Sequence, residues 1–417
     1  MNVPQGWSEA ALGDVCRIIS GATPKTGESL FWGGDVRWLT PNDLSKDRSQ
    51  TLSGGERSLT TAGYLSCSAR TFPAGSVIVS SRAPVGYVAI AGAEMCTNQG
   101  CKTAVPPEFI DSKYLYWYLL AAKPDLNARA SGTTFKEISS KRFAETRFHW
   151  PPLDEQRRIV DLLEDHLSRL DAAVDSLRRA LRRADAMVVS SLAAQVTGKR
   201  ECWSSSTVGA QAEVIQYGSG AKCDARATET DVPVLRMGNI KDGALVWGSL
   251  KYLPADHDDF PKLLLQPGDL LFNRTNSAEH VGKAAVFDSD CVASFASYLI
   301  RVRFHTEVLP AWANMVINSP MGREYVGSVV SQQVGQANVN GTKLKAFPLP
   351  LPTRDEQDRR IKEHSEVLAS RARLRSTGDA AISRAAGLRR SLLAAAFSGR
   401  LTGAGPDWSE PPEMISA

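Results

Sequence analysis

The chain has 417 residues, and its 49 lysines and arginines against 45 aspartates and glutamates give a formal net charge of +4 at pH 7. With 43% hydrophobic and 23% charged residues, the composition is typical of folded globular domains and excludes a disordered or fibrous chain. The longest mostly apolar stretch, Tyr114 to Ala122, is far shorter than the ~20 residues that span a bilayer, so we expect no membrane segment.

The first six residues have neither the basic nor the apolar region of a secretory signal, and none of the seven cysteines belongs to a CxxC pair. We therefore expect a cytoplasmic protein without disulfide bonds and without a metal site. The nearly balanced charge leaves nucleic-acid binding open, because a local basic face can exist on a surface that is neutral overall.

An internal duplication organises the chain up to residue 400. Its matching segments keep their order and a nearly constant separation, whereas chance matches would be scattered. The pairs are residues 6–8 with 202–204, 12–13 with 208–209, 36–39 with 232–235, 85–86 with 281–282, 154–156 with 355–357, and 190–199 with 391–400.

The first part of each copy, residues 1–150 and 200–351, has a mixed pattern. Short β-branched runs such as residues 76–79 and 87–90 are interrupted by glycine and proline. Such runs are typical of short strands joined by turns, so the sequence predicts a compact α+β domain in each copy.

Residues 153–197 predict one long helix, because no proline or glycine follows Pro151 and Pro152 until Gly198. Asp154 is in the position expected for an N-cap, and Gly198 is in that of a C-terminal capping glycine. One apolar stripe runs along this segment: Ile159, Leu162, Leu163, His166, Leu167, Leu170, Ala173, Val174, Leu177, Leu181, Ala184 and Val188.

A second helix is predicted after Pro352, ending at Gly399. Gly378 and Gly387 each weaken it by about 1 kcal/mol, and a break near residues 376–378 is an alternative to a continuous helix. Its stripe consists of Ile361, Val367, Leu368, Leu374, Ile382, Leu388, Leu392, Leu393 and Phe397.

A narrow apolar stripe needs a partner, and the equivalent stripe of the other copy is the simplest one. The first helix carries the chain away from the first domain and the second must return, so we expect antiparallel pairing with a domain at each end. The tail contains Trp408-Ser409, which resembles the start of a third copy and suggests a return toward the N-terminus; a chance pair is equally consistent. The expected order is domain 1–150, helix 151–199, domain 200–351, helix 352–400 and tail 401–417.

No catalytic motif is visible. The sequence lacks a phosphate-binding GxxxxGK[ST] loop, a GxGxxG turn, an HExxH pair and the Asn-Pro-Pro-aromatic motif of amino-methyltransferases. The acidic residues of 154–185 alternate with arginines, as on a solvated helix face. The sequence therefore predicts a non-catalytic protein.

Polar and basic residues concentrate in turn-like segments of both domains. Arginine, asparagine and glutamine read base edges in the major groove, while serine, threonine and lysine contact phosphates. Arg82 and Arg274 both follow a short strand and precede a Val-Gly pair, which suggests duplicated placement. The candidate DNA-binding residues are Lys25, Thr26, Asn42, Ser81, Arg82, Asn98, Gln99, Thr134 and Lys136 in the first domain, and Tyr217, Lys222, Arg236, Asn239, Asn273, Arg274, Asn276, Gln336 and Asn338 in the second.

Residues 151–159 (PPLDEQRRI), 352–357 (PTRDEQ) and 397–401 (FSGRL) resemble the DNA-specificity subunit of type I restriction–modification systems. Residues 235–240 and 273–283 look like one recurring class of target recognition domain in that family. The resemblance covers essentially the whole chain, although residues 81–84 form a shorter variant of the second domain's loop.

The resemblance implies two target recognition domains, each reading one half of an interrupted duplex sequence, and paired helices that set the gap. Two adenine-N6 methyltransferase subunits would dock on the helices, and two restriction/translocase subunits would join them. S-adenosylmethionine, ATP and Mg²⁺ would belong to those partners, with no cofactor in this chain. The helix residues expected to take part in docking are Ile159, Leu163, Leu170, Leu177, Leu181, Ile361, Leu368, Leu388 and Leu392.

Two other functions remain open from the sequence. One is a structural adaptor whose domains bind proteins, and the other is a fused DNA methyltransferase. The missing methyl-donor motif disfavours the second.

Overall fold

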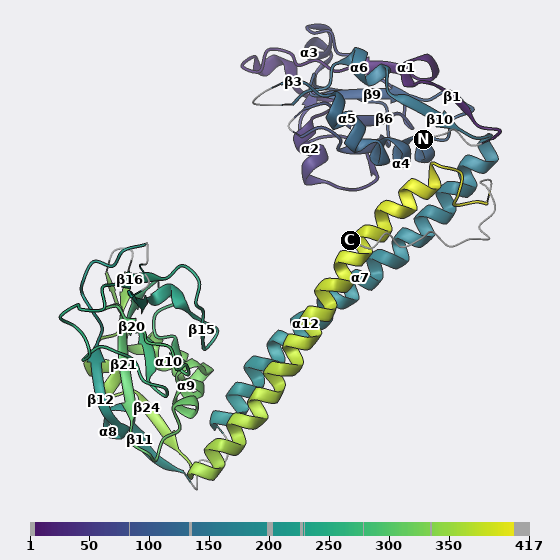
Figure 1. The fold of residues 1–417 in the computed structure, drawn as a ribbon. Coiled ribbons are helices and arrows are strands. Elements are labelled where there is room, and N and C mark those ends of the chain that lie inside the picture. Colours follow the sequence, from purple (N-terminus) through teal and green to yellow (C-terminus); the bar gives the residue numbers. More distant parts are fainter. Residues whose placement is uncertain are drawn as a thin grey trace. The chain divides into compact units, whose positions relative to one another are not determined.

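The computed structural model describes residues 5–82, 84–132, 136–197, 203–225, 228, 230–277, 279–333 and 336–403. It divides into two units, drawn in Figure 1: the first comprises Met1–Ser176 with Ala380–Ala417, and the second Leu177–Asp379. Each unit contains a globular head and a section of two long helices. We call residues 5–150 the first head and residues 203–351 the second head.

The first head is built on a five-stranded sheet in which only β4 and β7 pair in parallel. The middle strand β6 is buried on both faces: Val77 and Val79 pack with the aromatic side chains of α4, and Ile78 packs with Leu39. In sheet order the strands are β2 (Arg17–Ser20), β9 (Cys101–Val105), β6 (Val77–Ser80), β7 (Val88–Ala91) and β4 (Thr51–Leu52).

Smaller elements complete this head. A second sheet has the order β5 (Ser58–Leu59), β3 (Trp32–Leu39) and β8 (Cys96–Thr97), and β1 (Ser8–Ala11) pairs with β10 (Arg147–Trp150). The helices are α1 (Leu12–Val15), η1 (Ser29–Phe31), α2 (Pro41–Lys46), α3 (Thr61–Leu65), α4 (Ser112–Ala121), α5 (Lys123–Arg129) and α6 (Ser140–Ala144).

The second head repeats this plan. Its main sheet has the order β12 (Ala212–Tyr217), β21 (Leu299–Phe304), β17 (Leu270–Asn273) and β19 (Ala284–Val286). The other sheets are β16 (Lys251–Leu253), β13 (Val232–Leu235) and β20 (Ser294–Phe295); β11 (Ser204–Thr207) and β24 (Pro348–Leu351); β14 (Ile240–Lys241) and β15 (Ala244–Leu245); and β18 (Thr275–Asn276), β23 (Gln336–Asn338) and β22 (Ser331–Gln333). Its helices are α8 (Val208–Gln211), η3 (Met237–Asn239), α9 (Pro310–Asn318), α10 (Pro320–Val329) and α11 (Gly341–Lys345).

The duplication is therefore present in the fold as well as in the sequence. Strands β2, β9, β6 and β7 correspond in order and direction to β12, β21, β17 and β19, and the pair β1–β10 corresponds to β11–β24. The fold class predicted from the sequence, α+β with two mixed heads and two long antiparallel helices, is confirmed.

The first long helix, α7, spans Leu153–Thr197, as the sequence predicts. The expected N-cap is wrong, because the helix begins one residue before Asp154 and places Asp154 in its first turn. There the carboxylate still faces the positive end of the helix dipole. Gly198, the expected capping glycine, lies outside the described residues, as does Trp408 of the tail.

The buried side chain of Gln156 ties the start of α7 to the first head. Its carbonyl accepts from Asp111 N (2.9 Å), and its amide donates to the carbonyls of Phe109 (3.0 Å) and Pro151 (2.9 Å). Gln357 makes the corresponding three bonds at the start of α12. The repeated Asp-Glu-Gln sequence is thus a joint between head and helix.

The second long helix, α12, spans Arg354–Ala396 without a break at Gly378. A Cβ atom at Gly378 would lie 3.2 Å from Leu181 Cδ2 in α7, so this glycine permits close contact between the helices. The continuous helix is therefore the correct alternative.

In the second unit the two helices pair antiparallel, because the residue numbers of the contacting residues increase along α7 as they decrease along α12. Arg371 bonds to Asp185 (2.7 Å), and Arg360 bonds to the Gln195 carbonyl (2.7 Å). In the first unit Arg389 pairs with Asp171 (2.8 Å). The resulting seam joins helix sections within each unit.

The predicted apolar stripes are only partly buried. Ile159, Leu163 and Leu167 lie in the core of the first unit, and the helix residues Leu170, Leu177, Leu181, Ile361 and Leu392 are half-buried. The stripe is wrong for His166 and Ala173, which are exposed, and for Leu368, Leu374 and Leu388, which are 42%, 41% and 52% exposed. Two paired helices bury only a narrow strip of each other, so residues beside that strip face outward. None of the helices formed by the described residues has both the length and the apolar character needed to cross a membrane.

Candidate nucleic-acid interface

Several predicted residues of the first head meet beside the start of β9. The side-chain oxygen of Asn98 accepts a hydrogen bond from Gly100 N (2.9 Å), and the Thr23 hydroxyl donates to the side chain of Gln99. A Cβ at Gly100 would lie 3.1 Å from Asn98 Oδ1 and 3.3 Å from Arg82 Nε. The same atom would lie 2.8 Å from Pro41, beside the exposed Asn42 of α2. Asn98, Gln99, Arg82 and the start of α2 are therefore neighbours.

Arg82 is half-buried and forms an ion pair with Glu137 (3.8 Å). Ser81 is fully buried, and its hydroxyl has no hydrogen-bond partner among the described residues. Ser81 thus belongs to the wall behind Arg82 rather than to the surface.

Lys102 of β9 is a cation that the sequence reading missed. Its side chain is 6% exposed, and its Nζ donates to the Gln99 carbonyl (3.2 Å). Burial lowers its pKa, and the nearby carboxylate of Glu137 partly offsets this. The signal in the sequence was a single lysine within the otherwise uncharged strand Cys101–Val105.

In the second head, Arg274 lies over the ring of the exposed Tyr217, with 4.9 Å between its guanidinium carbon and the ring centre. Its Nη1 donates to the Ser297 carbonyl (3.4 Å), while its buried Nε has no partner among the described residues. Tyr217 is held in turn, because its hydroxyl accepts from Gly341 N (2.7 Å). A cation stacked on a fixed aromatic ring is oriented before any ligand binds.

A cavity of about 530 Å³ lies beside η3 in the second head. Of the predicted residues, Arg236, Asn239 and Asn276 line it, together with Lys241 and His280, which the sequence reading missed. Its described lining includes no carboxylate. Two cations around a concave surface favour an anionic or hydrogen-bond-accepting ligand such as a nucleic-acid backbone.

Three predicted asparagines instead support the backbone or a neighbouring side chain. Buried Asn239 donates to the carbonyls of Val246 and Gly248, and buried Asn273 donates to that of His280 (3.3 Å). Asn338 donates to Thr275 Oγ1 (2.7 Å) across the β18–β23 pair. The side-chain amide of Asn239 is fully engaged, because its oxygen also accepts from Arg236 N (2.9 Å), and this argues against direct base contact by that residue.

The other candidates are spread over the surface. Lys25, Thr26, Lys136 and Lys222 are exposed. Thr134 lies outside the described residues, and Gln336 belongs to β23 with a side chain outside them. Among the described residues, no three histidines, cysteines or carboxylates are placed to hold a metal ion.

Backbone hydrogen bonds define which residues of the two heads correspond. In the first head, Ser81 N donates to the Gly100 carbonyl (2.7 Å), and the Ser81 carbonyl accepts from Ile138 N (2.9 Å). Ser81 also directly follows the central strand β6.

In the second head, Arg274 occupies this place. Its N–H donates to the Tyr298 carbonyl (3.0 Å) and its carbonyl accepts from Val339 N (2.9 Å), directly after strand β17. The counterpart of Arg274 is therefore Ser81, and the expected equivalence with Arg82 is wrong by one residue. The loops that follow differ in length, which obscured this register in the sequence.

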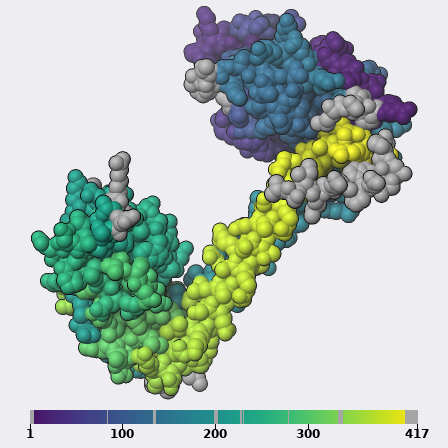
Figure 2. All heavy atoms as spheres, in the orientation of Figure 1, coloured from purple at the N-terminus to yellow at the C-terminus, as the bar shows by residue number. Residues whose placement is uncertain are grey.

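The long helices carry exposed apolar side chains. Figure 2 draws the surface of α12 in yellow-green. Leu368, Leu374 and Leu388 of α12, with Met187 and Val189 of α7, are each more than one-third exposed. Exposed aliphatic residues on a helix are suited to contact with another protein.

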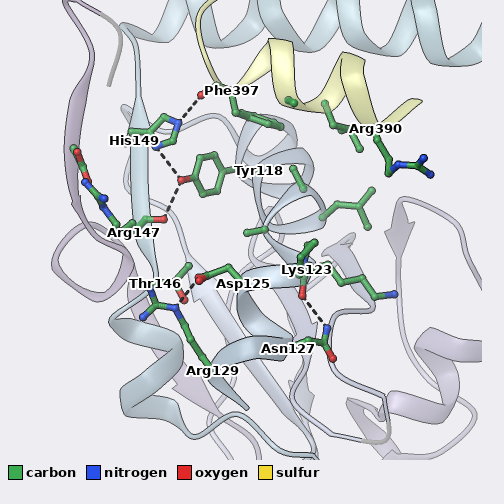
Figure 3. Close-up of a pocket in the computed structure, with 17 residues that line it drawn as sticks. Tyr118, Lys123, Asp125, Asn127, Arg129, Thr146, Arg147, His149, Arg390 and Phe397 are labelled. Carbon is green, nitrogen blue, oxygen red and sulfur yellow. Dashed lines mark hydrogen bonds and ion pairs between the residues drawn. The ribbon is translucent and has the colours of Figure 1, made fainter. Parts of the chain in front are cut away.

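A larger cavity, of about 920 Å³, lies in the first unit between α4, α5, β10 and the end of α12 (Figure 3). His149 joins these elements: one ring nitrogen contacts the Phe397 carbonyl (2.6 Å) and the other the Tyr118 hydroxyl (3.0 Å). Burial lowers the pKa of His149, so the neutral ring is favoured. This region anchors α12 to the first head.

Comparisons with known proteins agree with this architecture. A family model for the type I restriction modification DNA specificity domain matches residues 4–175. The chain is 37% identical over 164 residues to the MjaIX specificity subunit of Methanocaldococcus jannaschii, which covers 39% of this chain and 38% of that protein.

Other relatives match along the whole chain. The StySPI specificity subunit of Salmonella potsdam is 24% identical over 443 residues, covering 99% of this chain and 93% of its own. The EcoKI specificity subunit of Escherichia coli K12 is 23% identical over 442 residues, with the same coverage.

Two solved structures share the fold at 18% sequence identity. One, from work on complex assembly and conformational transition of the type I R-M system, has a TM-score of 0.74 and covers 96% of this chain and 100% of its own. The HsdS subunit from Thermoanaerobacter tengcongensis has a TM-score of 0.65, and the match covers 96% of this chain and 98% of that subunit. Residues 4–175 thus match the type I DNA specificity domain, and the chain as a whole is similar along nearly its full length to specificity subunits of type I restriction–modification systems.

Proposed function

We propose that this chain is the non-catalytic DNA-recognition subunit of a type I complex. Each head acts as a target recognition domain and reads one half of a bipartite duplex target in the major groove. The observation that carries the proposal is the duplicated head within a chain that matches specificity subunits along its whole length.

Side chains of both heads support a role in DNA reading. Arg274, stacked on Tyr217, presents a guanidinium that can donate to the O6 and N7 acceptors of guanine. Arg82, Asn98 and Gln99 form a comparable polar group in the first head. Lys25, Lys136 and Lys222 are exposed and suited to phosphate contacts.

The paired helices α7 and α12 set the gap between the two half-sequences and dock two adenine-N6 methyltransferase subunits. The exposed aliphatic side chains of Leu368, Leu374 and Leu388 support docking on α12. Two restriction/translocase subunits complete the nuclease. S-adenosylmethionine, ATP and Mg²⁺ act in those partners, and the assembly works in the cytoplasm, where the DNA lies.

The two alternatives predict different measurements. A protein-binding adaptor would show duplex affinity that changes little with salt, whereas phosphate contacts produce a steep loss as salt rises. A fused methyltransferase would methylate DNA without partner subunits.

The test is DNA binding by the full chain with its methyltransferase partners, with and without Arg274→Ala. We expect a steep salt dependence for the unaltered complex and a loss of about 1–3 kcal/mol at one half-site for the variant. Unchanged discrimination at both half-sites would contradict the role of Arg274.

A further inference from the structure

The register of the main sheets extends the correspondence between the heads to a second position. In the first head, Lys102 of β9 pairs with Val79 on one side and with Ser20 on the other. In the second head, Ile300 of β21 occupies that place.

Ile300 pairs with Phe272 on one side and with Tyr217 on the other. Lys102 therefore corresponds to Ile300, and Ser20 corresponds to Tyr217. One head has a lysine where the other has an aliphatic residue.

Side chains alternate between the faces of a sheet, so Val79 and Ser81 share a face with Lys102. Ser81 and Lys102 are diagonal neighbours on that face, within reach of a long side chain. The same holds for Arg274 and Ile300. Each head therefore has one cation and one uncharged residue at these two neighbouring positions. In the first head the cation is Lys102 beside Ser81, and in the second head it is Arg274 beside Ile300.

Both cations donate to backbone carbonyls at equivalent positions of the two heads. Lys102 Nζ donates to the carbonyl of Gln99, the residue before Gly100 (3.2 Å). Arg274 Nη1 donates to the carbonyl of Ser297, the residue before Tyr298 (3.4 Å). Because Gly100 corresponds to Tyr298, the positive charge lies at one equivalent point in each head, although it comes from different strands.

The packing around the two cations fits this exchange. Ser81 is small and fully buried, which leaves space on its face for the lysine stem. In the second head Arg274 takes the backbone position of Ser81, and the uncharged Ile300 takes that of Lys102. Among the described residues, Lys102 makes no ion pair with a carboxylate, so its burial has a cost that packing alone does not offset.

We propose that Lys102 is a specificity-determining residue of the first head and serves there as Arg274 serves in the second. Its ammonium, oriented by the Gln99 carbonyl, donates to the O6 or N7 acceptors of a purine in the first half-site. The inference rests on the proposed function, since it concerns the base edge that this head reads.

The test uses the full chain assembled with its methyltransferase subunits. Competitor duplexes carry the two half-sequences, with each base pair of the first half changed one at a time. For Lys102→Met we expect discrimination at one position of the first half-site to fall roughly tenfold or more. Discrimination in the second half-site stays unchanged, and the thermal unfolding midpoint does not fall, because the variant removes a buried charge. Lys141→Met, an exposed lysine of the same head, is the control and keeps full discrimination.

An exchange experiment separates base reading from a purely structural role. Lys102→Ile alone abolishes discrimination at that position, and Ser81→Arg combined with Lys102→Ile restores it with a guanidinium. The reciprocal pair, Arg274→Ser with Ile300→Lys, keeps discrimination in the second half-site and provides a second measurement should the first pair fold poorly.

Equal weakening of matched and altered first half-sites by Lys102→Met would overturn the inference, because a structural defect has no preferred base pair. So would an exchange pair that folds but does not restore discrimination. If the unaltered complex itself shows no half-site preference, the proposed function fails instead.

Discussion

Gly378 of α12 lies directly against Leu181 of α7: a Cβ atom on the glycine would stand 3.2 Å from Leu181 Cδ2 and 3.3 Å from Cδ1. At Gly387 the nearest atom to such a Cβ is Arg390 Nη2, at 3.9 Å. Both glycines lie in one continuous helix, yet only the first has a packing reason to be glycine.

We therefore expect opposite consequences from the same substitution. Gly387→Ala should raise the free energy of unfolding by about 0.5–1 kcal/mol, because alanine loses less backbone entropy in a helix. Gly378→Ala should gain clearly less or become destabilising, because Leu181 must move. Urea unfolding followed by circular dichroism measures both, and equal gains would contradict close packing at Gly378.

Gln156 supplies a second prediction. Gln156→Leu should lower the free energy of unfolding by about 2–3 kcal/mol, because Asp111 N and the carbonyls of Phe109 and Pro151 lose their partners in the interior. Asp154→Asn, at an exposed position in the same helical turn, is the matched control and should change it by only a few tenths. Similar effects of the two variants would show that the joint is not at Gln156.

The buried histidines predict loss of stability on acidification. Burial lowers the pKa of His149 in the first unit and of His364 in the second. The unfolded chain therefore binds protons first, so stability is full above about pH 6.5 and falls as the pH drops from there toward the folded-state pKa. His149→Gln and His364→Gln should each flatten the thermal unfolding midpoint between pH 7 and 5, relative to the unaltered chain. An unchanged slope in both variants would assign the effect to other groups.

Asp269 is the buried centre of an ion-pair group in the second head. Arg303 binds both its carboxylate oxygens, at 2.9 and 3.0 Å, and Arg301 lies 3.7 Å away. Asp269→Asn should destabilise the protein by about 3 kcal/mol, because two arginines lose their counter-charge in a buried setting. Asp125→Asn removes an exposed partner of Arg129 and should cost less than about 1 kcal/mol. Calorimetry of both variants checks the difference.

Periodicity predicted the long helices well, because an uninterrupted stripe from Ile159 onward has few alternative structures. Periodicity wrongly predicted burial of Leu368 and Leu388, because the apolar residues along the helix cover a wider face than the contact between two paired helices. The duplication correctly predicted two similar heads and two long helices, because similar sequences in the two copies are expected to adopt similar folds.

The candidate site could be predicted only in part. Loop composition pointed to Arg274 and Tyr217, which the fold brings together. It overlooked Lys102, because a charged residue inside a strand belongs to no loop. It did not foresee the burial of Asn239, because buried and exposed asparagines look alike in a sequence. Which side chains share a face depends on strand register, and loop lengths hide that register.

The central claim is that two heads read the two halves of one interrupted target. Mapping N6-methyladenine in host DNA, with and without this gene, tests it most directly. The account predicts that deletion removes methylation from a single asymmetric motif made of two specific half-sequences separated by a fixed unspecified gap. An unchanged methylation map, or loss of a motif without a gap, would contradict it.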